Sequence, residues 1–212
     1  MATISDQEGL ASGRQQGESS MTGWIPANPA PLGLMGFGIT TLVLSFVNAN
    51  LVGGGPLSFP IVLGLALAFG GTAQLLAGMW EFRTGNTFGA VAFTSYGAFW
   101  ISFFILVSFN VSGLLKTDTA EVGSLLGLYL WMWGIFTGLM FLCTFASPKA
   151  LSLLFLLLTI TFILLGIGNS GNDSGIIHAG GYFGIATGAV ALYIATADIM
   201  QAVYKRSVLP VG

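Results

Sequence analysis

Six long apolar segments follow one another along the chain. They cover residues 32–52, 56–80, 88–112, 122–145, 149–168 and 176–203. Each has at least 20 residues, and an α-helix needs about 20 to cross the hydrocarbon core of a bilayer. Membrane-spanning strands would alternate apolar and polar residues instead of forming such unbroken runs. The pattern therefore predicts an all-α integral membrane protein with six transmembrane helices in one domain.

The first 27 residues have a different character. Residues 1–20 are polar and rich in Gly and Ser, with four charged side chains and no apolar run. Such a composition cannot bury enough apolar surface to fold, and it lacks the apolar region of a secretory signal peptide. We expect a flexible polar tail over residues 1–27 and a six-helix transmembrane domain over residues 28–212.

Basic residues in the loops predict the orientation in the membrane. With six spans, both termini lie on the same side, together with the second and fourth loops. Five of the six basic residues fall on that side: Arg14, Arg83, Lys149, Lys205 and Arg206. The other side has only Lys116. Since cytoplasmic loops are enriched in Lys and Arg, both termini are predicted to be cytoplasmic.

The composition supports a membrane protein and narrows the chemistry. Apolar residues make up 54% of the chain and charged residues 7%, whereas a soluble domain has roughly 25% charged residues. Cys143 and His178 are the single residues of their kinds, so we expect no Cys cluster, no multi-histidine metal site and no cofactor. A net charge of -2 gives no indication of a nucleic-acid partner.

The first, third and fifth helices begin in similar ways. The starts are NPAP at residues 28–31, Asn86-Thr87 and Ser147-Pro148, spaced 58 and 61 residues apart. Each has a capping residue, and two have Pro at the first helical position. One interpretation is three helical hairpins around a pore, with three positive helix ends that favour an anion at the inner mouth. The alternative is ordinary capping, since any six-span chain shows similar spacing.

Two short motifs match other protein classes. The tripeptide NPA at residues 28–30 matches water and glycerol channels, but those need two copies and this chain has one. The sequence GNSG at residues 168–171, with His178 nearby, matches intramembrane serine proteases. Both parts would lie in one short connection, and GNSGND is a turn sequence first. We therefore expect no enzyme activity.

Charged residues are predicted near the helix ends, whereas the middle of the spans carries neutral polar groups. Glu81, Arg83 and Asp198 are interpreted as interfacial anchors. The neutral polar residues within the spans are Thr40, Thr41, Gln74, Thr94, Ser95, Tyr96, Thr159 and Thr161. A Thr or Ser can bond to the backbone of its own helix. The Gln74 amide cannot be satisfied against lipid, so it is expected to face protein or water.

Several segments resemble the acetate uptake transporter family, which includes bacterial succinate–acetate permeases and yeast acetate/ammonia-export relatives. They are NPAPLGL at 28–34, MGFG at 35–38, FGGTAQ at 69–74, Glu81, GNTFG at 85–89, AFTSYG at 92–97, Gly168-Asn169 and IIH at 176–178. The resemblance covers about residues 28–211. The seven-residue signature together with the later segments makes it specific.

This resemblance implies a fold, an assembly and a path. The family has six helices per subunit, a homohexameric ring and a separate path for small monocarboxylates through each subunit. It also implies a hydrophobic constriction, which falls on Phe37, Tyr96 and Leu158 in this chain. These lie 9, 10 and 11 residues beyond the predicted caps, about 13–17 Å into their helices. The other candidates for the substrate path are Asn28, Thr40, Thr41, Gln74, Asn86, Thr87 and Thr94.

The sequence thus predicts a plasma-membrane permease or channel for acetate and other small carboxylates such as succinate. A channel for ammonia or another small neutral solute is the alternative. Whether the path conducts the anion or couples it to a proton stays open at this point. A bare carboxylate loses several kcal/mol on desolvation, whereas neutral acetic acid loses much less.

Overall fold

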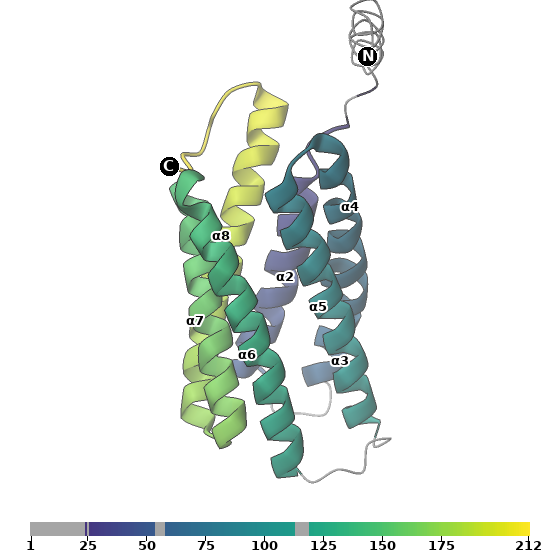
Figure 1. The fold of residues 1–212 in the computed structure, drawn as a ribbon, viewed down its shortest axis with the longest axis vertical. Coiled ribbons are helices and arrows are strands. Elements are labelled where there is room, and N and C mark those ends of the chain that lie inside the picture. Colours follow the sequence, from purple (N-terminus) through teal and green to yellow (C-terminus); the bar gives the residue numbers. More distant parts are fainter. Residues whose placement is uncertain (1–23, 25, 54–57, 113–118) are drawn as a thin grey trace, which may run out of the picture.

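The structure, a computed structural model, describes residue 24 and residues 26–53, 58–112 and 119–212. Most of the predicted tail over residues 1–27, as well as Lys116 in the third loop, lies outside the described residues. All regular elements of the described part are helical (Figure 1). Six helices are long and apolar enough to span a membrane, which confirms the predicted fold class.

The helices alternate in direction along the chain. Five spans are continuous α-helices: α2 (Ala30–Asn48), α5 (Thr87–Val111), α6 (Thr119–Cys143), α7 (Lys149–Gly171) and α8 (Ser174–Tyr204). The second span is composite: α3 (Ser58–Leu67), a π-helical segment (Ala68–Ala73) and α4 (Gln74–Thr84). A short 3₁₀ segment (Thr144–Ala146) extends α6. Helices α2, α5 and α7 start at the same end of the molecule, near residue 212; we call it the terminal end and the other the distal end (Figure 1).

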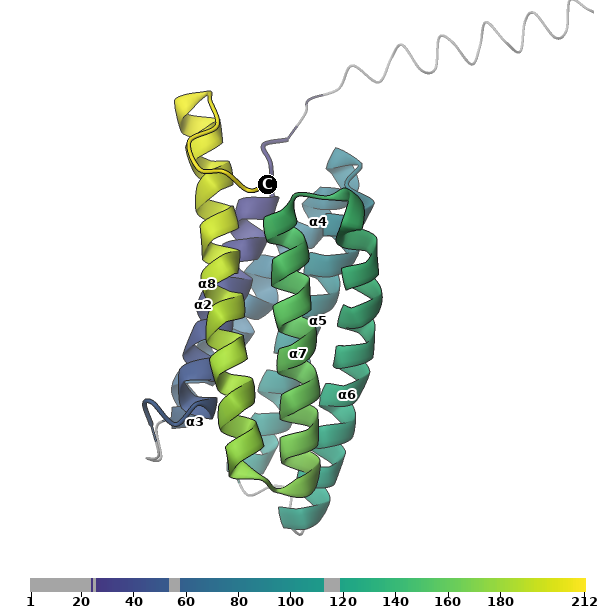
Figure 2. The ribbon, with the colours of Figure 1, turned by 90° about the vertical axis from the view of Figure 1, so that its left-hand side faces the viewer.

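The six spans form a closed ring in chain order. Helix α2 packs on α8, α8 on α7 and α7 on α6, while the composite second span lies between α2 and α5. Figure 2 shows α8, α7 and α6 side by side on one face. Large side chains join α5 to α6: the Phe99 ring stacks on Tyr129 at a centroid distance of 5.8 Å, and the Ser102 and Tyr129 hydroxyls are 2.6 Å apart. The ring therefore encloses an interior lined by all six spans.

Glycines bring α2 and α8 close together. A Cβ atom added at Gly188 would lie 2.6 Å from Leu42 Cγ and 2.9 Å from the Gly38 carbonyl oxygen. A Cβ atom at Gly184 would meet the Ser45 hydroxyl. Gly127 on α6 likewise faces the Gly166 carbonyl oxygen of α7. These glycines serve packing within one subunit, since small residues let backbones approach closely in lipid.

Two helix ends differ from the sequence prediction. The first helix ends at Asn48 rather than near residue 52, because Asn50 adopts a left-handed backbone with φ of 54°. The fifth helix runs on to Gly171 and ends at Asn172, which has φ of 50°. The GNSG segment is therefore the last turn of α7 and not a turn between helices.

Only some of the predicted N-caps are confirmed. The Asn86 side chain accepts a 3.0 Å hydrogen bond from the Gly89 N–H, as expected for an N-cap. The Asn28 side chain accepts a 3.0 Å bond from the Ala30 N–H, but the predicted cap at Asn28 is wrong, because Pro29 is the N-cap of α2. The prediction for Ser147 is wrong, because Pro148 is the N-cap of α7 and provides no side-chain hydrogen bond.

The chain's last residues supply an acceptor at this start of α7. The Ala150 N–H donates to the Val211 carbonyl oxygen at 2.9 Å. A segment near residue 212 thus occupies one of the three helix ends that the sequence offered to an anion.

The π-helical segment was not expected from the sequence. It contains Gly70 and Gly71, and it lies against α2, where a Cβ atom at Gly70 would meet Thr40. The Thr72 hydroxyl donates to the Leu67 carbonyl oxygen at 2.8 Å, five residues earlier in the chain. The extra residue of the π-turn changes the face on which the following residues lie, beginning with Gln74.

Candidate functional site

Two cavities lie in the interior of the ring. The cavity at the terminal end has a volume of about 180 Å³ and is bordered by the starts of α2, α5 and α7. The cavity at the distal end has a volume of about 540 Å³ and reaches Asn48, Asn110 and Glu121 near the helix ends. We call them the terminal cavity and the distal cavity. Phe37 and Leu158 line both, so the two spaces meet at these side chains.

The three residues of the predicted constriction come together in the structure. Phe37, Tyr96 and Leu158 have only 4%, 3% and 3% of their surface exposed. The Phe37 and Tyr96 rings have a centroid distance of 5.6 Å. The three residues lie 7, 9 and 9 positions after the first residues of α2, α5 and α7, about 10–14 Å along each helix. Equal depth on three parallel helices places them at one level, with Tyr96 facing the terminal cavity.

Large aromatic side chains surround this level. Tyr96 packs edge-on against Phe136, with ring centroids 5.6 Å apart, and lies 6.1 Å from Trp133 and 6.2 Å from Phe155. Its hydroxyl is 2.9 Å from the Thr137 hydroxyl of α6. The neck between the cavities is thus apolar, apart from one phenolic oxygen.

Besides Tyr96, three polar side chains line the terminal cavity. Gln74, Asn86 and Asp198 border it among mostly apolar residues. Gln74 is 1% exposed, and neither atom of its amide has a hydrogen-bond partner within the described part of the chain. Val211 also borders this cavity, so the chain's last residues form part of its wall. The predicted position of Gln74, facing protein or a wet space, agrees with this geometry.

The distal cavity has two hydrogen-bond donors next to the neck. The Thr41 hydroxyl and the Trp100 indole N–H are both buried and have no partner among the described residues. Both residues border this cavity. Thr41 follows Phe37 by four residues and Trp100 follows Tyr96 by four, so each donor lies about one helical turn beyond a residue of the neck. Sequence reasoning missed Trp100, although this four-residue spacing from Tyr96 could have indicated it.

The other predicted path residues border neither cavity. Asn28 and Thr87 are exposed at the starts of their helices. Thr40 packs against Gly70 of the π-helical segment, and Thr94 packs against Gly78 of α4. These two threonines fill the grooves that glycines leave between neighbouring helices.

The interpretation of Glu81 as an interfacial anchor is wrong. Only 1% of its surface is exposed. Thr84 donates to its Oε2 atom at 3.0 Å, and the Asn86 amide lies beside its carboxyl group in the space that Gly89 leaves open. Asp198 is half-buried and borders the terminal cavity. Two carboxyl groups therefore lie near the terminal cavity, in place of anchors that face lipid headgroups.

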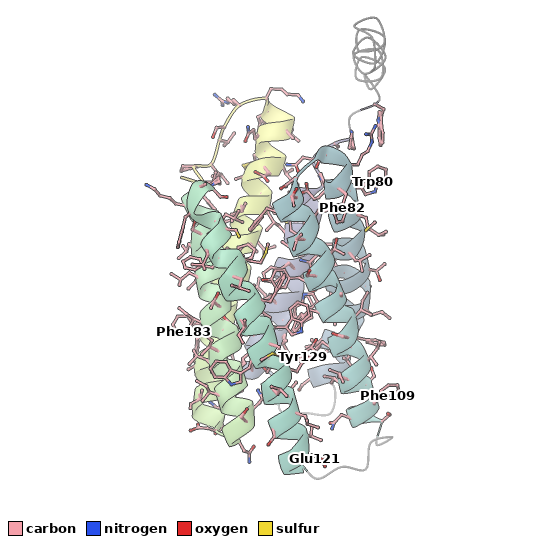
Figure 3. The ribbon with its side chains drawn as sticks, viewed as in Figure 1. Trp80, Phe82, Phe109, Glu121, Tyr129 and Phe183 are labelled. Carbon is pink, nitrogen blue, oxygen red and sulfur yellow. The ribbon has the colours of Figure 1, made fainter. Side chains whose placement is uncertain are left out.

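The outer surface is apolar, as the six spans require. Trp80, Phe82, Phe109 and Phe183 are exposed large hydrophobic residues on the outside of the ring (Figure 3). Glu121 lies at the distal end in the same view. In the described part of the chain, no group of three His, Cys, Asp or Glu side chains could hold a metal ion.

Six apolar spans around two cavities that meet at an aromatic neck define a multi-pass membrane transport protein. The chain belongs to the GPR1/FUN34/yaaH family, whose model matches residues 16–211. This confirms the resemblance found in the sequence. With its transporter relatives, the chain is a multi-pass protein of the cell membrane.

Named relatives support this assignment. The succinate-acetate/proton symporter SatP of Escherichia coli (strain K12) is 43% identical over 88% of this chain and 95% of its own length. Ammonia transport outward protein 2 of Saccharomyces cerevisiae is 42% identical over 82% of this chain and 61% of its own length. The solved structure of the bacterial acetate channel SatP has a TM-score of 0.81 at 41% identity, covering 88% of this chain and 99% of that one.

Proposed function

We propose that this protein is a permease for acetate and other small carboxylates such as succinate, with one path through each subunit. The path runs from the terminal cavity past Phe37, Tyr96 and Leu158 into the distal cavity. The observation that carries the proposal is that both cavities end on Phe37 and Leu158, at one level of the bundle. The names of the bacterial relatives support acetate as the solute.

The chemistry of the cavity walls suits a carboxylate. A carboxylate accepts hydrogen bonds at two oxygens, and the Thr41 hydroxyl and the Trp100 indole N–H are free to donate on the distal side. The Gln74 amide offers a donor on the terminal side. We infer that these groups replace part of the solute's hydration shell before and after the neck. Asn86 borders the terminal cavity and is included in the path; Asn28, Thr40, Thr87 and Thr94 have supporting roles in capping or packing.

The proposed activity is transport without a chemical reaction. Ser170, the only candidate nucleophile of the GNSG segment, is exposed at the end of α7. A serine nucleophile needs a base within hydrogen-bond reach, and no bond joins Ser170 to His178 in the described residues. With both termini in the cytoplasm, as the basic residues predict, the terminal cavity is the cytoplasmic vestibule.

We further propose that the subunits assemble as a homohexamer in the bilayer, as the family resemblance implies. The glycine pairs do not support this assembly, since Gly123, Gly127, Gly184 and Gly188 all contact helices of the same subunit. The exposed apolar faces leave room for contacts between subunits. Mass measurement in mild detergent is expected to give six subunits, and a mass of one subunit under all mild conditions would contradict the hexamer.

Transport by purified protein in liposomes tests the proposed solute. We expect labelled acetate to enter these vesicles faster than protein-free liposomes of the same lipid, while ammonia entry, followed by a dye for the internal pH, stays near the protein-free rate. The yeast relative's name provides the specific alternative. Accelerated ammonia entry without accelerated acetate entry would establish that alternative and contradict the proposal.

The Gln74 amide provides a test of the path on the terminal side. Since the amide makes no hydrogen bond to the described protein, Gln74→Met should not lower the free energy of unfolding. Acetate uptake should nevertheless fall, because a donor beside the neck is lost. Gln201→Met, on the exposed surface of α8, is the matched control. Unchanged uptake rate and apparent affinity in Gln74→Met would show that the solute does not meet this amide.

Truncation of the neck should change the size limit for the solute. Phe37→Ala and Leu158→Ala each remove buried atoms and should cost ~2–5 kcal/mol of stability. They should also raise entry of succinate and lactate relative to acetate, because the path widens. Tyr96→Phe should keep the size limit and change the rate. The measurement is uptake of each labelled acid by folded protein in liposomes.

The control for this experiment is a buried side chain away from the path. Met140 is 8% exposed and borders neither cavity, so Met140→Ala should lose stability with the wild-type size preference. If the folded Phe37→Ala and Leu158→Ala variants also keep that preference, the size limit is set elsewhere.

A further inference from the structure

The Tyr96 hydroxyl is the only polar group that the three side chains of the neck provide. It lies 2.9 Å from the hydroxyl oxygen of Thr137 on α6. Thr137 is fully buried, with 0% of its surface exposed, and its hydroxyl donates to the Trp133 carbonyl oxygen at 2.7 Å. The three oxygens form a short chain that leads from the neck into the backbone of α6.

The number of available protons determines which group is the donor in each of these two hydrogen bonds. A carbonyl oxygen can only accept a hydrogen bond, and a threonine hydroxyl has a single proton. The Thr137 proton is therefore used in the bond to Trp133. The bond between the two hydroxyls must then use the Tyr96 proton, so Tyr96 donates and Thr137 accepts. As a result, the Tyr96 oxygen has lone pairs to offer but no free proton.

The aromatic side chains around Tyr96 keep the hydroxyl in this arrangement. Rings from three other helices pack on it: Phe37 of α2, Trp133 and Phe136 of α6, and Phe155 of α7. None of them carries a charge. The carboxyl groups near the cavities are Asp198 of α8, which borders the terminal cavity, Glu81 of α4 close to that cavity, and Glu121 of α6, which borders the distal cavity. At the neck itself, therefore, hydrogen bonding decides which form of the solute is favoured.

We propose that Thr137 is a positioning residue that presents the Tyr96 oxygen as an acceptor only, and that the neck therefore favours the carboxylic acid over the carboxylate. An ionised carboxylate has only acceptors, so it gains no hydrogen bond from Tyr96. The protonated acid has an O–H group that can donate to the Tyr96 oxygen. This inference rests on the proposed function and specifies the form in which the solute crosses.

The proton balance of one crossing is simple. A carboxylate in one cavity takes a proton from water, crosses the neck as the neutral acid, and returns the proton to water in the other cavity. One carboxylate and one proton move together, and no net charge crosses the membrane. Passage of the bare anion, in contrast, moves one negative charge and responds to the membrane potential.

Removal of the Thr137 hydroxyl should shift this preference. In Thr137→Val the shape is kept, but Tyr96 loses its acceptor and can donate its proton toward the path. We expect the ratio of potential-driven to potential-independent acetate uptake to rise about tenfold, the factor that one hydrogen bond to a charged group provides. The decline of uptake with rising pH should become shallower. Uptake is measured in liposomes with a potassium diffusion potential, after subtraction of the protein-free rate.

Two controls separate this role from a structural one. Thr137→Ser keeps the hydroxyl and should retain the wild-type ratio. Thr159→Val removes a threonine that also donates to its own helix, at 2.7 Å from the Phe155 carbonyl oxygen, and borders neither cavity; it should also retain the wild-type ratio. A wild-type ratio in folded Thr137→Val, or a raised ratio in Thr137→Ser, would overturn the inference.

A further variant applies if Thr137→Val does not fold. Tyr96→Phe removes the acceptor without creating a donor, so potential-independent uptake should fall while potential-driven uptake does not rise. A rise of potential-driven uptake in Tyr96→Phe would overturn the inference. Wild-type protein that gives no acetate uptake in either mode would overturn the proposed function instead. Wild-type uptake that depends mainly on the potential would leave that function intact and contradict only the role of Thr137.

Discussion

The hydrocarbon core of a bilayer contains no water, and every polar group that the chain carries into it must find a partner inside the protein. This constraint makes helices the only elements of the described spans, since an α-helix satisfies its own backbone. It also governs the side chains. The hydroxyls of Thr159, Thr161 and Thr187 each donate to a carbonyl oxygen four residues earlier in the same helix. The buried side chains without a partner among the described residues lie between helices or beside the cavities.

The polar side chains without a hydrogen-bond partner fall into two groups: some pack between helices, and others border the cavities of the proposed path. Thr40 and Thr94 face glycines of the second span, where the close approach of helices leaves room for a threonine. Gln74, Thr41 and Trp100 border the cavities instead. A buried polar group without a hydrogen bond costs roughly 1–3 kcal/mol. A solute or water that reaches the cavity supplies the missing partner, which gives these three residues a reason to be polar.

The six spans could be predicted from the sequence, because apolar runs of about 20 residues are typical of membrane-spanning helices. The Asn86 cap could also be predicted, because an N-cap depends only on residues next to each other in the chain. Other features depend on tertiary contacts that no local pattern contains. Ser147 has the right side chain for a cap, yet Pro148 and the carbonyl oxygen of Val211 complete that helix end. The burial of Glu81 depends on the packing of α4 against α5.

The candidate site was predictable where the family resemblance supplied it, and less so elsewhere. Phe37, Tyr96 and Leu158 meet at one level because equal depth on parallel helices follows from the chain order. In the second span, the amide of Gln74 indicates an inward position, whereas no pattern indicates the burial of Glu81, which follows the π-helical segment. The bond from Tyr96 to Thr137 joins residues 41 positions apart, and no sequence spacing indicates it.

The two sides of the neck differ in their polar groups, although each cavity has one carboxyl group in its wall: Asp198 in the terminal cavity and Glu121 in the distal cavity. The distal cavity places donors beside the neck, whereas the terminal cavity is small and has Asp198 in its wall, with Glu81 close by. A bare carboxylate loses several kcal/mol of hydration in an apolar neck, whereas the neutral acid loses much less. The apolar neck and the acceptor oxygen of Tyr96 therefore act in the same direction: each raises the free energy of the anion relative to that of the acid.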